Sequence, residues 1–147
     1  MENAKLSKPT DPVFTLNNAS RLSETPAHSI RQYIDKGLLL PFVTKTGRHL
    51  FSEVDITRLK SIKNYLNDHG LNIAGIKAIY SLIPCWAIKK CSLSERNNCG
   101  AYSSIATPCW EASNKSFICL NTDCRECEIY RIPENSKDLK DIIKEVT

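Results

Sequence analysis

Apolar residues in the first half of the chain recur three and four positions apart, the spacing of one face of a helix. The spacing predicts four helices, over residues 16–22, 26–36, 53–69 and 73–82. Thr25 is expected to be the N-cap of the second helix, with Pro26 as its first helical residue. Gly37 is expected to end that helix, because glycine accepts the left-handed conformation that follows many helices.

The segment between the second and third helices predicts two short β-strands. Residues 38–51 flank the turn Lys45-Thr46-Gly47, whose composition is typical of a hairpin. Ser52 follows as the expected N-cap of the third helix, with Asp55 three residues later. The buried stripe of that helix is predicted to be Ile56, Leu59, Ile62 and Leu66, with Gly70 at its end.

The pattern changes after Pro84, where helical periodicity fades and turn residues multiply. One amphipathic helix is expected near the end, over residues 136–145, with Leu139, Ile142, Ile143 and Val146 on one side. Residues 1–12 contain two prolines and few apolar residues, and they predict a flexible arm. The predicted domains are the arm 1–12, a winged helix-turn-helix 13–83, a loop-rich cysteine module 84–132 and a C-terminal helix 133–147. The expected fold class is therefore mainly α with a small β-wing, joined to a small cysteine or metal module.

Composition and charge narrow the class of function. The chain has 147 residues, 41% of them hydrophobic, and no apolar run approaches the ~20 residues that a membrane helix needs. The N-terminus lacks the apolar core of a secretory signal, so a cytoplasmic protein without a membrane partner is expected. Residues 1–84 carry eleven Lys and Arg against seven Asp and Glu, and the remainder is neutral. The whole net charge of +4 thus lies in the first half, which favours a polyanionic partner there or reflects ordinary surface scatter.

Two short helices followed by a β-wing can place one helix in the major groove of DNA. The second helix would be the recognition helix, and its outward positions would include Thr25, His28, Ser29, Arg31 and Gln32. Gln and Arg side chains can make paired hydrogen bonds to base edges. On the wing, Lys45, Arg48 and His49 suit contacts with phosphate. The alternative is a small helical domain with ordinary polar surface residues.

Four segments between residues 13 and 82 occur in a familiar order: Ser29-Ile30-Arg31-Gln32-Tyr33-Ile34-Asp35-Lys36-Gly37-Leu38-Leu39, Gly47-Arg48-His49-Leu50-Phe51-Ser52, Asp55-Ile56-Thr57-Arg58-Leu59 and Gly70-Leu71-Asn72-Ile73-Ala74-Gly75-Ile76-Lys77. Through them, residues 13–82 resemble the N-terminal domain of MerR-family regulators. The last segment looks most like the heat-shock and nitrogen repressor branches of that family. The resemblance implies that Arg31 and Tyr33 contact DNA and that the wing grips the backbone. Where the family usually has an arginine in the wing, this chain has His49, and Arg48 beside it is the expected substitute.

The resemblance also implies binding as a dimer to near-palindromic sites. Many members of the family dimerise through a long helix after this domain, but here Pro84 and Cys85 interrupt the chain after Leu82. The helix at 136–145 is the candidate for the dimer contact, or it packs on its own subunit. The expected partners are double-stranded DNA and a second copy of the chain, with RNA polymerase as a further candidate.

All seven cysteines lie in the second half of the chain. They are Cys85, Cys91, Cys99, Cys109, Cys119, Cys124 and Cys127. In a reducing compartment such a cluster indicates metal ligation or redox chemistry. The last three follow the Cys-x4-Cys-x2-Cys spacing of plant-type [2Fe–2S] ferredoxins, with the fourth ligand left open among the other four. Three hypotheses remain: an iron–sulfur cluster, a structural zinc site, and free thiols that sense without metal.

The doubled Cys-Trp pair, Cys85-Trp86 and Cys109-Trp110, resembles a small cysteine-rich module of bacterial signalling proteins, which assigns no activity. The sequence contains no phosphate loop, no nucleophile with a matched base and no pair of catalytic carboxylates, so an enzyme is not expected. The sequence predicts a MerR-type transcription regulator whose activity is set by a cysteine-ligated iron–sulfur centre with a redox or gas-sensing role. The alternative is an architectural or excision-type DNA-binding protein with a structural zinc module.

Overall fold

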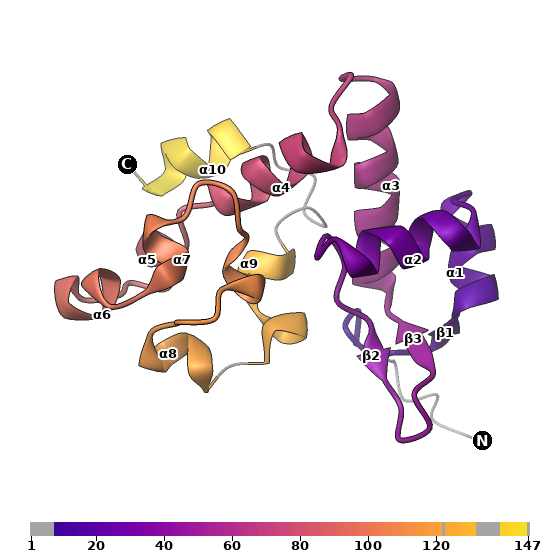
Figure 1. Ribbon diagram of the computed structural model, residues 1–147, viewed down its shortest axis with the longest axis horizontal. Helices are drawn as coiled ribbons and strands as arrows, with labels where there is room; N and C mark the ends of the chain where they lie inside the picture. The colour runs from indigo at the N-terminus through magenta and orange to yellow at the C-terminus, as the bar shows by residue number, and fades with distance from the viewer. Residues whose placement is uncertain (1–7, 122, 132–138, 147) are drawn as a thin grey trace, which may run out of the picture.

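A computed structural model describes residues 8–121, 123–131 and 139–146 (Figure 1). The first half contains β1 (Phe14–Thr15), α1 (Leu16–Ser23), α2 (Ala27–Asp35), β2 (Phe42–Val43), β3 (His49–Phe51), α3 (Glu53–Asn67) and α4 (Ile73–Ser81). The second half contains α5 (Cys85–Ile88), α6 (Leu93–Asn97), α7 (Gly100–Ser103), η1 (Cys109–Glu111), α8 (Phe117–Leu120), η2 (Cys124–Glu126), α9 (Glu128–Arg131) and α10 (Leu139–Val146). The predicted fold class is confirmed: a mainly helical chain with a small antiparallel sheet and a loop-rich second half.

Local capping explains where the helices of the first half begin and end. Ser52 caps α3 by a capping box, in which its hydroxyl accepts from the Asp55 amide and the Asp55 carboxylate accepts from the Ser52 amide. Gly37 follows α2 with a φ of 79°, and Leu38 N–H donates to the Tyr33 carbonyl across the helix end. This Schellman arrangement needs a left-handed residue, which glycine supplies without strain. The start of α3 and the end of α2 were both predicted, and both predictions are confirmed.

The start of α2 differs from the prediction. Its N-cap is Pro26, which makes no side-chain cap hydrogen bond, and Ala27 is the first helical residue. The Thr25 hydroxyl donates to the Ser23 carbonyl instead, so Thr25 as the expected N-cap is wrong. The Ser29 amide, which a side-chain cap usually serves, donates to the Pro26 carbonyl at 3.0 Å instead.

The sheet contains the predicted hairpin and one further strand. Its order is β1-β3-β2, with both pairs antiparallel, Phe14 opposite Phe51 and Phe42 opposite Leu50. Strand β1 was not predicted, because two residues are too few to establish an alternating pattern. It ties the start of the winged helix-turn-helix to the wing, which we define as residues 42–51.

Residues 8–12 pack against the rest of the chain, in contrast to the flexible arm predicted for residues 1–12. Thr10 is only 7% exposed, and the Pro9 carbonyl accepts a hydrogen bond from the Val54 amide. The Thr10 hydroxyl donates to Glu126 in the second half of the chain. Residues 1–7 of the predicted arm lie outside the described residues.

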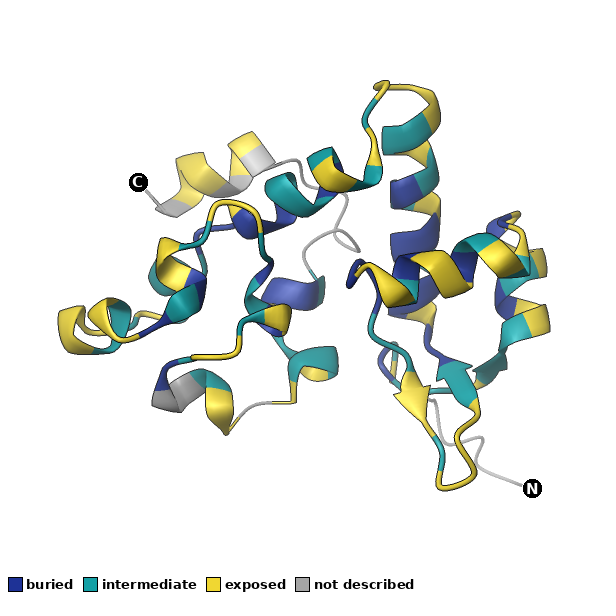
Figure 2. Cartoon of the chain, in the orientation of Figure 1, coloured by how far each residue is buried: buried dark blue, intermediate teal, exposed yellow. Residues whose placement is uncertain are grey.

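The hydrophobic core is continuous between the two halves of the chain (Figure 2). Leu59 and Ile62 of α3 are fully buried. Of the other two residues of the predicted stripe, Ile56 is buried and Leu66 is partly buried. From the second half, Trp110, Ile129 and Tyr130 join the same cluster. The core therefore includes side chains of the cysteine module, which is defined as residues 84–132.

Before α10, the described part of the second half consists of helices of three to five residues and loops, as the loss of periodicity predicts. The predicted C-terminal helix is present as α10, and its Ile143 is 40% exposed. Residues 136–138 of that prediction, and the side chains of Leu139, Ile142 and Val146, lie outside the described residues. No helix in the described part of the chain is long and apolar enough to cross a membrane.

Candidate nucleic-acid interface and cysteine centre

Helix α2, the candidate recognition helix, separates a buried face from an exposed one. Ile30 is fully buried and Tyr33 is 7% exposed, as the apolar spacing predicts. On the opposite side His28, Arg31 and Gln32 are exposed. Three of the predicted recognition residues thus face solvent, where a DNA groove could reach them.

The other predicted residues of this helix lie differently. Ser29 is half-buried and lies near the Tyr33 hydroxyl, whose pKa is raised above its ordinary value mainly by burial, an effect that Ser29 opposes. Thr25 is 4% exposed, so its predicted outward position is wrong. Its side chain points back into the turn between α1 and α2, where the hydroxyl donates to the Ser23 carbonyl.

An open groove of about 340 Å³ joins the recognition helix to the wing. Arg31 lines it from α2, and the predicted wing residues Arg48 and His49 line it from the other side. The sequence did not predict the third wall, formed by Thr15, Leu16 and Asn17 at the N-terminus of α1. A helix N-terminus favours anions, because its first N–H groups lack helical partners and its dipole is positive there.

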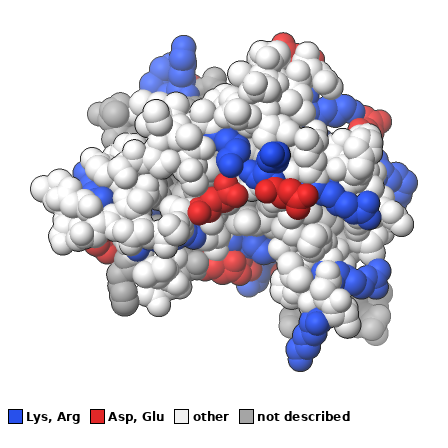
Figure 3. All heavy atoms as spheres, in the orientation of Figure 1, with Lys and Arg blue, Asp and Glu red and all other residues white. Residues whose placement is uncertain are grey.

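The charge of this groove suits the phosphate backbone of DNA. Arg31 and Arg48 bring two positive charges to it, and Lys45 lies exposed at the nearby turn of the wing. On the face drawn in Figure 3, basic side chains project from the wing at the lower right. Acidic and basic side chains gather together at the centre of that face. The Lys77 ammonium and the Glu111 carboxylate form an ion pair at 3.2 Å.

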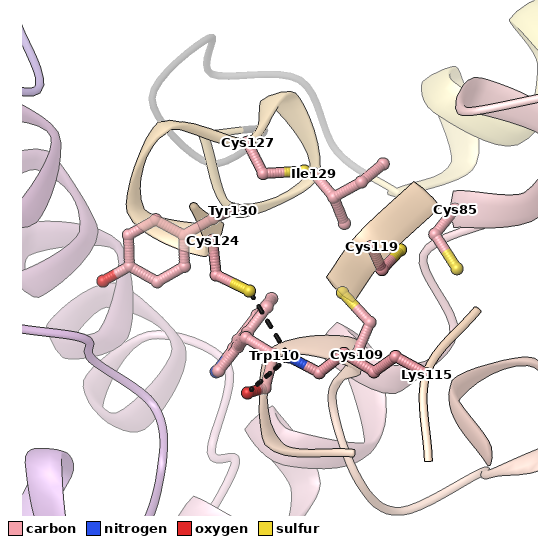
Figure 4. Close-up of a pocket in the computed structure, with 9 residues that line it drawn as sticks. All are labelled: Cys85, Cys109, Trp110, Lys115, Cys119, Cys124, Cys127, Ile129 and Tyr130. Carbon is pink, nitrogen blue, oxygen red and sulfur yellow. Dashed lines mark hydrogen bonds between the residues drawn. The ribbon is translucent and has the colours of Figure 1, made fainter. Parts of the chain in front are cut away.

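The seven cysteines are all free thiols, and they line two neighbouring cavities. The first cavity, about 20 Å³, is lined by Cys85, Cys109, Cys119, Cys124 and Cys127 (Figure 4). The second cavity, about 10 Å³, is lined by Cys85, Cys91, Cys99 and Cys119. Each has about the room that one water molecule needs. Thiols far apart in the sequence are therefore brought together, and Cys85 and Cys119 belong to both cavities.

The donor chemistry of these cavities fits a thiophilic metal, since thiolates bind zinc and iron–sulfur clusters. In the described part of the chain, no three His, Cys, Asp or Glu side chains are already arranged to hold a metal ion. Metal ligation would therefore draw the thiols closer together than they stand. Trp110 and Tyr130 line the first cavity beside its cysteines, and both are buried.

Burial controls the protonation of the innermost thiols. It raises the pKa of Cys109 to about 12, and the thiols of Cys85, Cys127, Cys124 and Cys119 add to the effect. The pKa of Cys85 is raised to about 11, again mainly by burial, with contributions from Cys119, Cys99 and Cys91. Without a metal, both side chains are neutral thiols at pH 7, and ligation would release their protons.

One cation lies within the first cavity. The Lys115 ammonium donates to the Cys124 sulfur at 3.4 Å and to the Trp110 carbonyl at 3.3 Å (Figure 4). A donor beside a thiolate sulfur stabilises its negative charge and influences the potential of any centre that it ligates. This lysine could not be predicted as a neighbour of the site, because it precedes Cys124 by nine residues within a loop.

The residues beside these cysteines contact the loop that follows the recognition helix, residues 37–40. The indole N–H of Trp110 donates to the Gly37 carbonyl at 2.7 Å. The Tyr130 hydroxyl accepts from the Leu40 amide at 2.8 Å and donates to Asp55 at 3.1 Å. Arg125 donates to the Leu40 carbonyl and forms an ion pair with Asp55 at 3.2 Å. Both carbonyl and amide groups of the loop are thus held by the cysteine module.

A buried arginine completes this contact. Arg58 of α3 is 1% exposed, and its side chain donates to the carbonyls of Leu38 at 2.7 Å and Tyr130 at 2.6 Å. Its guanidinium lies 4.0 to 4.6 Å from the ring centroids of Tyr130, Tyr80 and Trp110. Such a stack compensates for the loss of water around a buried cation. Arg58 therefore bonds to the loop and to the module at once.

Asp55 and Arg58 were not predicted from the sequence to form an interaction site. Asp55 was named only beside the helix cap and Arg58 only within the family resemblance. The available signal was their position three residues apart on the face of α3 that also carries Leu59 and Ile62. Two charged residues on a buried stripe predict a buried polar network. Their partners could not be inferred, since Arg125 and Tyr130 lie 70 and 75 residues beyond Asp55.

Comparison with known proteins concerns the first half of the chain. Residues 14–82 match the family described as MerR HTH family regulatory protein. Over 68 residues the chain is 41% identical to the HTH-type transcriptional regulator GlnR of Bacillus anthracis. This aligned region covers 46% of the chain and 52% of GlnR. It is 35% identical over 71 residues to the putative heat shock protein HspR of Streptomyces coelicolor, covering 48% and 47%. The chain spans about half the length of the curated relatives it matches.

Proposed function

We propose that this protein is a MerR-type transcription regulator that binds double-stranded DNA, and that a cysteine-ligated iron–sulfur centre sets its affinity for DNA. The MerR-family domain and its relatives, which are described as a transcriptional regulator and a heat shock protein, support the first part. The groove between Arg31, Arg48 and His49 supports a DNA-facing surface. Recognition would come from Arg31, Gln32 and His28, with Lys45 and Arg48 on phosphates.

One observation carries the regulatory part of the proposal. Trp110 and Tyr130 line the first cysteine cavity, and the same two side chains hydrogen-bond to Gly37 and Leu40 in the loop between the recognition helix and the wing. Any change in the packing of the cavity would therefore act on the loop through direct contacts. A packed core of this kind has few intermediate arrangements, so a small shift is passed on rather than absorbed.

The proposed ligands of the centre are Cys109, Cys119, Cys124 and Cys127. The last three have the ferredoxin-like spacing, and Cys109 lines the same cavity, whereas Cys91 and Cys99 line only the second one. When bound, an iron–sulfur centre supplies a change of charge or of integrity between two states. The chain's own part is to exclude water with Trp110 and Tyr130, and to place the Lys115 ammonium against the Cys124 sulfur.

The proposed partners are DNA and a second copy of the chain, with RNA polymerase as a further candidate. Two copies would place two recognition helices on a near-palindromic site. The C-terminal helix α10, which exposes Ile143, is the proposed contact between the copies.

The test is an absorption spectrum and an iron analysis of protein purified without oxygen, combined with DNA binding. The DNA is a duplex enriched from random sequences by the protein itself, and binding is measured with the centre intact and after its removal by a chelator. Broad visible absorbance, bound iron and a change in affinity on removal are expected. A colourless protein without iron would refute the iron–sulfur centre, and an unchanged affinity would refute its regulatory role.

A second candidate function is an architectural or excision-type DNA-binding protein with a structural zinc site. The small size of the cavities favours it, because about 20 Å³ accommodates a single ion more readily than a cluster of several atoms. Four thiolates around zinc would staple the one-turn helices of the module together. The same elemental analysis decides: zinc without iron, and an affinity for DNA that is lost only with the fold, would support this candidate.

A further inference from the structure

The proposed centre leaves three thiols without a role. With Cys109, Cys119, Cys124 and Cys127 assigned as its ligands, Cys85, Cys91 and Cys99 remain. All three line the second cavity, whose other thiol is Cys119. The second cavity thus has four thiols of its own, and it adjoins the first through Cys85 and Cys119. The three remaining cysteines are therefore grouped around one cavity of their own.

The backbone around the second cavity is fixed by its own hydrogen bonds. Cys91 and Cys99 flank α6, whose start is held by a capping box between Ser92 and Glu95. The Arg96 side chain donates to the Cys91 carbonyl at 3.0 Å, and the Cys99 amide donates to the Arg96 carbonyl at 3.2 Å. The Cys91 amide also donates to the Trp86 carbonyl at 2.9 Å, which ties Cys91 to the turn that carries Cys85. The three thiols are therefore presented by one fixed substructure.

The second cavity is lined by an aromatic pair and by a buried polar group. Trp86 and Tyr102 pack edge to face, with ring centroids 5.2 Å apart, and both line it. Ser116 lines it as well and is 5% exposed. Within the described part of the chain its hydroxyl makes no hydrogen bond of ordinary geometry, although it lies near enough to the Cys119 thiol to oppose the rise of its pKa. A buried hydroxyl beside a thiol can donate to the sulfur once that sulfur is a thiolate.

The number of thiols fits two four-coordinate sites that share one ligand. Two such sites need eight ligand positions, and the chain has seven cysteines. Cys119 lines both cavities and belongs to the first site by its spacing. We infer that Cys85, Cys91 and Cys99 form a second metal site, for a zinc-type divalent cation, and that the Cys119 thiolate bridges it to the first site. The inference rests on the proposed function only in taking Cys119 as a ligand of the first centre.

Zinc is the cation that this surrounding favours. A closed, all-thiolate site without an open position is typical of structural zinc, and thiolates select zinc over harder divalent cations. Each thiol would give up its proton to solvent as it binds. The site would hold α5, α6 and α7 together, which are helices of four or five residues that cannot be stable alone.

The experiment is elemental analysis of the full chain and of two double variants, all purified without oxygen. The wild-type protein is expected to contain about one zinc per chain besides the metal of the first centre. Cys91→Ser/Cys99→Ser should lose this zinc and keep the metal and spectrum of the first centre. Cys124→Ser/Cys127→Ser should show the reverse. As a control, Ser92→Ala weakens the cap of α6 and removes no ligand, so it should retain the zinc.

Titration of the metal-free chains with cobalt(II) provides a second measurement, because thiolate ligation of cobalt gives charge-transfer absorbance. The wild type should take up about two cobalt ions per chain with this absorbance, and Cys91→Ser/Cys99→Ser about one. Saturation of the wild type at about one ion would overturn the second site, as would zinc that survives in Cys91→Ser/Cys99→Ser. A protein without iron that nevertheless holds two zinc ions would refute the iron–sulfur proposal and support the second site.

Discussion

Replacing Tyr130 with phenylalanine should weaken the contact between the cysteine module and the recognition helix. The ring is 1% exposed, and the change removes only the hydroxyl. That hydroxyl accepts from the Leu40 amide at 2.8 Å and donates to the fully buried Asp55 carboxylate at 3.1 Å. Phenylalanine keeps the volume and the stack on Arg58, so a loss of stability would come from the hydrogen bonds alone.

The magnitude follows from what the two partners retain. Asp55 keeps the Ser52 amide and the Arg125 guanidinium, so it loses one of its donors, which costs about 1.5–3 kcal/mol for a charged acceptor. In the described structure no other partner replaces the hydroxyl at the part-buried Leu40 amide, and the loss of this hydrogen bond costs about 0.5–1.5 kcal/mol. Partial relaxation and water entry reduce the sum, and a decrease of about 2–4 kcal/mol in the free energy of unfolding is expected.

The assay is urea unfolding of the wild type and of two tyrosine variants, followed by circular dichroism. Tyr102→Phe is the matched control, since it removes the same atom from a side chain that is 40% exposed and lies outside the contact. It should stay within about 0.5 kcal/mol of the wild type. If Tyr130→Phe were as stable as Tyr102→Phe, the module would not be held to the loop by this hydroxyl, and the proposed route to the recognition helix would lose its best-defined link.

Three further variants test separate parts of the structure. Gly37→Ala should destabilise the chain by about 1 kcal/mol or more in urea unfolding, because a φ of 79° strains any residue with a Cβ and the Glu111 carboxylate would have to move away from Lys77. Gly47→Ala, with φ 84° and open space, is the control for φ alone, and a Gly37→Ala variant as stable as the wild type would contradict the need for a left-handed residue at the end of α2. Arg31→Ala should weaken binding to the selected duplex by about 1–3 kcal/mol in a gel shift, and a folded variant with unchanged affinity would exclude α2 as the recognition helix. Truncation after Asn135 should convert dimers to monomers in sedimentation; dimers that persist would place the contact between copies elsewhere.

Much of the winged helix-turn-helix could be predicted because its determinants are local. Ser52 with Asp55, and Gly37 at the end of α2, act within a few residues of themselves, so their sequence signals were sufficient. The prediction for Thr25 was wrong because Pro26, the next residue, is itself the N-cap. The helix therefore begins one position later than predicted, at Ala27. Strand β1 depends on its partner Phe51, 37 positions away in the chain, and has no periodicity of its own.

The cysteine centre could also be predicted only in part. The spacing of Cys119, Cys124 and Cys127 was visible in the sequence, whereas the grouping of seven thiols around two cavities depends on how the one-turn helices fold back. The docking of the module on the 37–40 loop depends on Arg58, whose partner Tyr130 lies 72 residues further along the chain. Pairing over such separations leaves no regular pattern in the sequence, because only the folded chain brings the residues together.

The central claim is that the state of the cysteine centre sets the affinity for DNA, and one measurement tests it most directly. The dissociation constant for the selected duplex is determined by fluorescence anisotropy for the anaerobic protein, the oxidised protein and the protein stripped of its centre, at one salt concentration. We expect the dissociation constant to differ by at least about tenfold, or ~1.4 kcal/mol, between the intact and the stripped protein. Circular dichroism should show that the first half of the stripped protein is still folded. Equal dissociation constants for all three forms would contradict the central claim.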